Sequence, residues 1–284
     1  MIKKIIPLVI LISFGISSCG VSFNLPQVTP GPIIQENVEA AVPLDSYGST
    51  RLVLTFGAGE MNINPGSDSL ISGQVKYNIP DFKPEITTSN NTVNVKQGSF
   101  TLDKFPNFSN VVNKWDLELG AYPMELEISA GAYTASMELG GLAIANLTIK
   151  DGASDVELSF SEKNLSQMNL FRYETGASQV TLTGLANADF SLLEFSGGAG
   201  NYTIDFSGEL RRNATASITV GLGNVWIVIP QDLPTQLTID GKITNMTIGS
   251  GWIKNGNTYS QNGFGPMLTI IVKTGAANLI IAGS

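Results

Sequence analysis

The chain has 284 residues, a formal net charge of −8, a single cysteine and no histidine. A lone cysteine excludes an intramolecular disulfide. The lack of histidine argues against zinc, copper and haem sites, and against Ser-His-Asp and Cys-His catalytic groups. We therefore expect no metal and no cofactor. The negative charge argues against nucleic acid and anionic lipid head groups as partners.

Residues 1–18 have the organisation of a secretory signal peptide. Two lysines near the N-terminus precede an apolar run from Ile5 to Ile16, which is shorter than the about 20 residues of a transmembrane helix. Small residues then lead to Cys19, and this pattern resembles the lipobox of bacterial lipoproteins, in which the cysteine is diacylated after cleavage. We therefore predict lipidation at Cys19. An ordinary signal peptide or a short membrane anchor are the alternatives.

Residues 19–37 are predicted to hold the lipidated cysteine and a flexible linker. The segment contains Pro26, Pro30 and Pro32 and shows little hydrophobic periodicity. Such a composition is typical of an extended spacer that separates a folded region from a membrane.

A seven-residue phrase recurs through most of the remaining chain. It opens with a glycine, carries a polar residue in fourth place, and has apolar residues in fifth and seventh place, which is the period of a strand with one buried face. Glycine at the start allows a tight corner with unusual backbone angles. Copies begin at Gly57, Gly131, Gly152, Gly176, Gly198, Gly221, Lys242 and Gly275.

Each corner is also preceded by alternating apolar residues, so the unit is strand, corner, strand and loop, with about 22 residues. One unit cannot bury its own apolar face, and neighbouring units must therefore stack. The pattern predicts an all-β, single-stack β-solenoid. An evenly spaced antiparallel sandwich is the alternative. In a stack, the polar residues in fourth place would form hydrogen-bonded ladders.

Residues 38–120 depart from this period after the first phrase. Strand-like segments occur at 75–79, 85–88, 92–95 and 115–119, and prolines separate several of them. We predict an N-terminal β region over 38–120 that continues into the stack and caps it, followed by solenoid repeats over 121–284.

The sequence at this point resembles known families. Leu52–Ile63, Leu70–Gly73 and Lys83–Glu85 are similar to the N-terminal segment of toast-rack domains. The region from Pro123, with its Gly-Ala corners and Val228–Pro230, resembles the C-terminal domain of LiaF-type envelope proteins and the related putative-adhesin β-solenoids. The resemblance implies a toast-rack-like fold in an exported bacterial envelope protein linked to cell-wall stress sensing or adhesion. LiaF-type proteins usually carry transmembrane helices ahead of this domain, which a lipid anchor would replace here.

Few residues are candidates for chemistry. Trp226 interrupts an outward stripe of threonines and is our candidate surface contact. Asp155 and its neighbours are the alternative for a calcium site, although clustered carboxylates are lacking. Glu138, Asp189 and Glu194 lie in different units, so no catalytic pair is identified.

These observations predict a non-enzymatic cell-envelope lipoprotein that presents a β-solenoid for binding or adhesion. Its N-terminal lipid would hold it on the outer face of the cell membrane, or on an outer membrane where the cell has one. The expected partner is an envelope protein or a polysaccharide. A sensory or scaffolding role in a cell-wall stress response is the alternative, and a carbohydrate-active β-helix enzyme is a more distant one.

Overall fold

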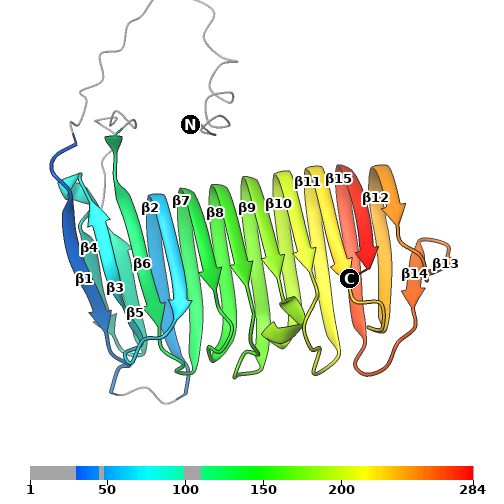
Figure 1. Ribbon diagram of the computed structural model, residues 1–284, viewed down its shortest axis with the longest axis horizontal. Coiled ribbons are helices and arrows are strands. Elements are labelled where there is room, and N and C mark those ends of the chain that lie inside the picture. The colour runs from blue at the N-terminus through cyan, green and yellow to red at the C-terminus, as the bar shows by residue number, and fades with distance from the viewer. Residues whose placement is uncertain (1–29, 45–47, 99–109, 284) are drawn as a thin grey trace, which may run out of the picture.

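The computed structural model describes residues 30–44, 48–98 and 110–283 (Figure 1). Within these ranges the chain forms a single 15-stranded sheet and two short 3-10 helices, η1 (Pro80–Phe82) and η3 (Leu185–Ala188). The predicted signal peptide, Cys19 and the residues up to 29 lie outside the described ranges.

Parallel strands that bend back on themselves make up most of the structure. Each passes through a phrase of the repeat and turns at its glycine, so that it forms a U in Figure 1 with one half in each of two facing layers. The predicted β-solenoid is therefore confirmed, with strand, corner and strand joined as one continuous strand. In the described ranges these coils are β2 (Thr50–Pro65), β7 (Met124–Glu138), β8 (Ile144–Ser159), β9 (Met168–Thr183), β10 (Phe190–Asp205), β11 (Ala214–Ile229), β12 (Thr235–Ile248) and β15 (Leu268–Gly283).

The coils do not stack in chain order at the C-terminal end. The spatial order is β10-β11-β15-β12, so the last coil of the chain lies between two earlier ones. After β11 the chain forms β12 two positions along the stack, which leaves the position between them for another coil. The chain then turns through the hairpin of β13 (Ile253–Asn255) and β14 (Thr258–Gln261) and returns as β15 in that position. The only trace of this in the sequence is the longer interval between Lys242 and Gly275.

The corner glycines are needed because adjacent coils approach closely. A Cβ built on Gly176 would lie 2.4 Å from the carbonyl oxygen of Gly152, and one on Gly131 would lie 2.4 Å from that of Gly57. Their φ angles lie outside the left-handed region. The predicted reason, unusual backbone angles at the corner, is therefore wrong for these positions. A side chain is excluded by the neighbouring backbone.

The apolar residues of the phrase fill the space between the two layers. The side chains predicted to point inward are buried from β2 to β15, including Met61, Phe195 and Ile281. In β12, Leu237 is fully buried, whereas Ile239 and Ile248 are only partly buried because β12 is the last coil of the stack. Aromatic rings pack edge to face in this core, with the centroids of Phe195 and Tyr202 5.1 Å apart.

The N-terminal strands extend both layers beyond β2. They are β1 (Ile34–Ala40), β3 (Ile71–Tyr77), β4 (Pro84–Ser89), β5 (Thr92–Gln97) and β6 (Asn113–Leu119). The order β1-β3-β6 continues from the second half of β2, and β5 pairs with its first half. The sheet is thus continuous across residue 120, and a domain division there stays a prediction.

The linker ends earlier than predicted. Strand β1 begins at Ile34, inside the range 19–37, and pairs antiparallel with β3 through Val38 opposite Gly73. Its first residues are largely exposed, so hydrophobic periodicity does not reveal them, and the pairing with β3 defines the strand instead.

Candidate functional site

One continuous surface is formed by the outward side chains of β3, of β6 and of the second halves of the coils, and we call it the polar face. Strand pairing sets one residue of each strand side by side across this face, and we call this line the central row. From β3 to β12 it reads Gln74, Asp116, Asn62, Ser136, Glu157, Thr181, Thr203, Trp226, Ile280 and Thr247. These residues are outward because side chains alternate between the faces of a strand.

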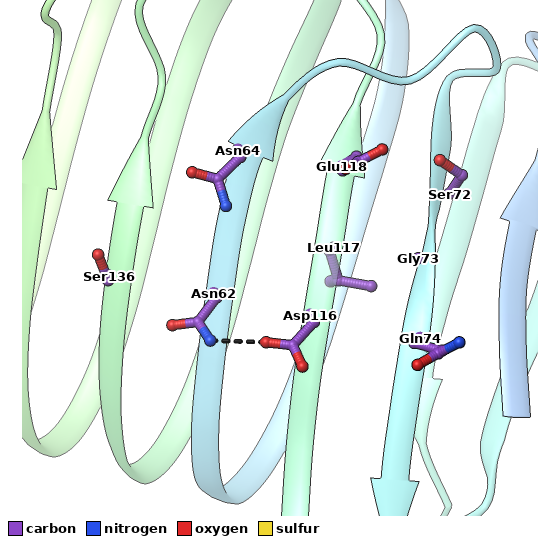
Figure 2. Close-up of a pocket in the computed structure, with 9 residues that line it drawn as sticks. All are labelled: Asn62, Asn64, Ser72, Gly73, Gln74, Asp116, Leu117, Glu118 and Ser136. Carbon is purple, nitrogen blue, oxygen red and sulfur yellow. Dashed lines mark hydrogen bonds between the residues drawn. The ribbon is translucent and has the colours of Figure 1, made fainter. Parts of the chain in front are cut away.

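The polar face is hollowed into an open pocket of about 630 Å³ over β3, β6, β2 and β7. Figure 2 shows Asn62 and Asn64 on one side, Ser72 and Gln74 on the other, and two carboxylates between them. The carboxylates are Asp116 and Glu118 of β6. The walls therefore carry amides, hydroxyls and carboxylates, which together donate and accept hydrogen bonds.

Glycine at position 73 lets β3 lie close to β6 beside this pocket. Gly73 has a φ of +152°, and a Cβ there would lie 2.3 Å from the carbonyl oxygen of Asp116. Figure 2 shows the residue at the same level as Leu117, between the upper and lower polar side chains. A side chain at this position would collide with the backbone of β6 at Asp116 and Leu117.

One wall of the pocket is held in place by its own contacts. The side-chain amide of Asn62 donates to Oδ1 of Asp116 over 2.7 Å, and Lys114 Nζ lies 3.6 Å from the same oxygen. A second, smaller hollow of about 250 Å³ adjoins the first and is lined by Glu60, Glu157 and their neighbours.

Carboxylates on the polar face differ in their pairing from those on the opposite face. Among the described residues, Glu60, Glu118 and Glu157 have no hydrogen-bond or ion-pair partner. On the opposite face, formed by the first halves of the coils, the side chains of Glu127, Glu174 and Glu194 are each paired with a lysine or arginine. These three carboxylates of the polar face are therefore free to accept hydrogen bonds from a ligand.

Trp226 stands on the central row as predicted from the repeat. It is 49% exposed, with Thr203 beside it on β10 and Ile280 beside it on β15. A large, half-exposed indole on a flat polar surface is an unusual feature that offers an apolar contact. Its role as a surface contact stays a prediction.

The predicted ladder of polar side chains is present next to the central row. Asn224 donates to Asn201 over 2.7 Å, Asn278 to Asn224 over 2.8 Å, and Asn245 to Asn278 over 2.9 Å. The ladder follows the spatial order of the coils, with β15 in its inserted place. It fixes the orientation of the amides along the C-terminal part of the polar face.

The carboxylates considered for catalysis make separate structural contacts. Glu138 accepts hydrogen bonds from the backbone N–H of Gly140 over 2.6 Å and of Ser161 over 3.0 Å. Glu194 is on the opposite face, where it accepts from Arg172 over 2.6 Å. They are not brought together in one site.

Asp189 belongs to a buried connection between loops. Its carboxylate is 3.2 Å from both Arg211 and Arg212, which are adjacent in the sequence. Arg211 also donates to the carbonyl of Asn164, whose fully buried amide bonds both the N–H and the C=O of Ile144. These side chains hold the loop edge of neighbouring coils together.

A cluster rich in hydroxyls lies under the corners of β7 to β10. Asp151 accepts hydrogen bonds from Tyr173 over 2.8 Å, from Tyr133 over 3.4 Å, and from Thr175. Burial and the nearby carboxylate raise the pKa of Tyr133 and of Tyr173 far above its usual value. Burial, together with Asp151, raises the pKa of Tyr202 to about 12. The cluster is internal and stabilises the corner.

The described part of the chain contains no group of three or more Asp, Glu, Cys or His side chains that could hold a metal ion. Asp155, the candidate calcium ligand, instead accepts a hydrogen bond from Gln179 over 3.3 Å. In residues 30–44, 48–98 and 110–283 no helix has the length and apolar character required to span a membrane.

The pocket was not predicted from the sequence. The alternation of the phrase places Asn62 outward, but Asp116 lies outside the regular phrase, and nothing in the chain order places β6 between β3 and β2. The alternation from Trp115 to Leu119 was a usable signal for the strand and for its outward carboxylates.

Comparison with solved structures gives several matches of low sequence identity. A putative cell adhesion protein from Clostridium sporogenes is 18% identical over 89% of this chain and 100% of its own, with a TM-score of 0.49. A putative lipid binding protein from Parabacteroides distasonis is 10% identical over 89% and 99%, with a TM-score of 0.37. A putative adhesin from Parabacteroides merdae is 9% identical over 90% and 99%, with a TM-score of 0.35.

No curated protein matches the chain. The family model for the N-terminal domain of toast_rack, DUF2154, matches residues 32–183, which is more than half of the 284 residues and extends from β1 to the end of β9. The predicted resemblance to toast-rack domains is thereby confirmed: the chain belongs to the toast-rack family.

Proposed function

We propose that the protein is a non-enzymatic lipoprotein of the bacterial cell envelope that binds a partner through the polar face of its solenoid. The observation that carries this proposal is the central row, a flat line of outward polar side chains that ends in a pocket at β6 and contains a half-exposed Trp226.

The geometry of the polar face supports binding. Its side chains are carried on paired strands, and hydrogen bonds such as those of the asparagine ladder fix several of them before any ligand arrives. Little conformational entropy is then lost on association, which favours affinity. The carboxylates considered for catalysis lie apart and serve the fold, as does the buried Asp189.

The proposed location depends on Cys19. A diacylated cysteine anchors stably where one acyl chain would bind only marginally. A Cys19→Ser variant is expected to lose lipidation and to leave the membrane fraction, which metabolic labelling with a palmitate analogue and fractionation would measure. Retention of the unlabelled variant in the membrane would contradict the anchor.

Binding is tested by retention of the purified full chain, in detergent, on native envelope material and on isolated peptidoglycan. We expect saturable retention that is lost in a variant with Glu118→Lys and Trp226→Ala on the polar face. A matched variant with Glu125→Lys and Leu222→Ala, off the polar face, should be retained like the wild type. Equal retention of the two variants, or no saturable retention at all, would refute the proposal.

A further inference from the structure

The central row has two ends with different chemistry. At one end, the pocket beside β6 presents the carboxylates of Asp116 and Glu118 with amides and hydroxyls around them. At the other end, Trp226 and Ile280 are neighbours on adjacent strands and offer apolar surface. Six strand spacings separate Asp116 from Trp226, or about 29 Å at about 4.8 Å per strand.

We propose that the central row binds a neutral, hydroxyl-rich glycan chain that lies across the strands from the pocket to Trp226. This inference rests on the proposed function and names the ligand class of the same surface. Because the two ends are about 29 Å apart, the ligand must be an extended chain, since a single sugar cannot contact both.

The hydrogen-bonding groups of the row suit sugar hydroxyls. A hydroxyl both donates and accepts, an amide such as that of Asn62 does the same, and a carboxylate accepts only. Bonds from hydroxyls to an ionised carboxylate are shorter and stronger than neutral ones. Thr181 and Thr203 continue the row with small hydroxyl groups, which leave the surface flat between the two ends.

Charge on the polar face selects against anionic ligands. Glu60, Glu118 and Glu157 are unpaired among the described residues, and Lys114, next to the pocket, is already engaged with Asp116. A polyanion placed along the row would meet like charges with few cations to offset them. A neutral chain meets no such repulsion.

An indole side chain is suited to the apolar face of a sugar ring. Trp226 is half exposed and is flanked by the hydroxyl of Thr203 on one side, so a ring stacked on the indole keeps a polar group within reach. Leu222, on the same strand, is also exposed but lies at the corner, away from the central row. It is therefore a matched control for loss of an exposed apolar side chain.

The test is calorimetric titration of the purified full chain in detergent with cellohexaose, N-acetylchitohexaose and maltohexaose, and with glucose and N-acetylglucosamine. We expect at least one hexasaccharide to bind, and its monosaccharide to bind at least about tenfold more weakly. Trp226→Ala should weaken the hexasaccharide by about tenfold or more, as removal of a central aromatic contact does. Leu222→Ala should leave the affinity unchanged.

A second arm separates hydroxyl recognition from charge attraction. Glu118→Ala should weaken binding severalfold, Glu125→Ala should not, and a tenfold rise in salt should leave the affinity of a neutral chain unchanged. Failure of all three hexasaccharides, or equal affinity for Trp226→Ala and wild type, would overturn the glycan proposal.

The proposed function can survive that failure. Suppose that the protein still binds envelope material through the polar face, while poly-lysine or salt displaces the protein from that material. In that case the ligand is cationic, and only the glycan inference is wrong. If the polar-face variants retain envelope material like wild type, both proposals are wrong.

Discussion

Replacement of Gly176 by alanine tests why each coil begins its corner with glycine. In most strands this change is neutral or stabilising by about 0.4–1 kcal/mol, because alanine restricts the unfolded chain. Here the new Cβ would lie 2.4 Å from the carbonyl oxygen of Gly152, whereas ordinary contacts begin at 3.4 Å. The two coils must therefore separate locally by about 1 Å, or the corner must distort.

That separation weakens the backbone hydrogen bonds on both sides of the corner. Pairs of β8 and β9 residues flank it, Asp151 with Thr175 and Ala153 with Ala177. Each lost hydrogen bond costs about 1 kcal/mol net, so two to four of them give a destabilisation of about 2–4 kcal/mol. We expect urea unfolding of the full chain to show this decrease in the free energy of unfolding.

Two other glycines provide graded controls. A Cβ on Gly152 would lie 3.0 Å from the carbonyl oxygen of Gly131, so Gly152→Ala should cost about 1 kcal/mol or less, since the coils need move only slightly. A Cβ on Gly249 would have no contact closer than 3.7 Å, so Gly249→Ala should be tolerated. Equal stability of Gly176→Ala and Gly249→Ala would refute the close-approach explanation.

Two further predictions concern buried polar groups. The pKa of Tyr202 rises from 10.0 to about 12 in the folded chain. The protonated side chain therefore makes its full contribution to the free energy of unfolding below pH 10, and about 2–3 kcal/mol is lost as the pH rises through 12. Tyr202→Phe should reduce this alkaline loss of stability in urea unfolding measured against pH, and an unchanged profile would contradict the prediction. Asn164→Ala should destabilise by about 3 kcal/mol or more, because it leaves the buried N–H and C=O of Ile144 without their partner, and a change below about 1 kcal/mol in the same assay would contradict this.

Local repetition in the sequence was sufficient to predict the coils. The glycine phrase defines both the corner and the alternation that buries Met61 in β2 and Ile281 in β15, and each of these signals is local. The asparagine ladder was predicted for the same reason, since residues in equal places of equal units must lie side by side once the units stack.

Long-range order was not available from the same signals. Strand β6 lies between β3 and β2 through pairings such as Asp116 opposite Gln74, and no property of these two residues specifies that choice. The pocket depends on this arrangement and on the close approach of β3 at Gly73, and so it was not predicted.

The inserted coil connects the irregular part of the fold to the candidate site. In a stack built in chain order, Trp226 would have Thr247 as its neighbour on the next coil. Because β15 lies between β11 and β12, its neighbour is Ile280, and Thr247 is one strand further away. The apolar end of the central row is therefore a product of the insertion, and a change that prevents β15 from entering the stack should remove this end while leaving the pocket at β6 intact.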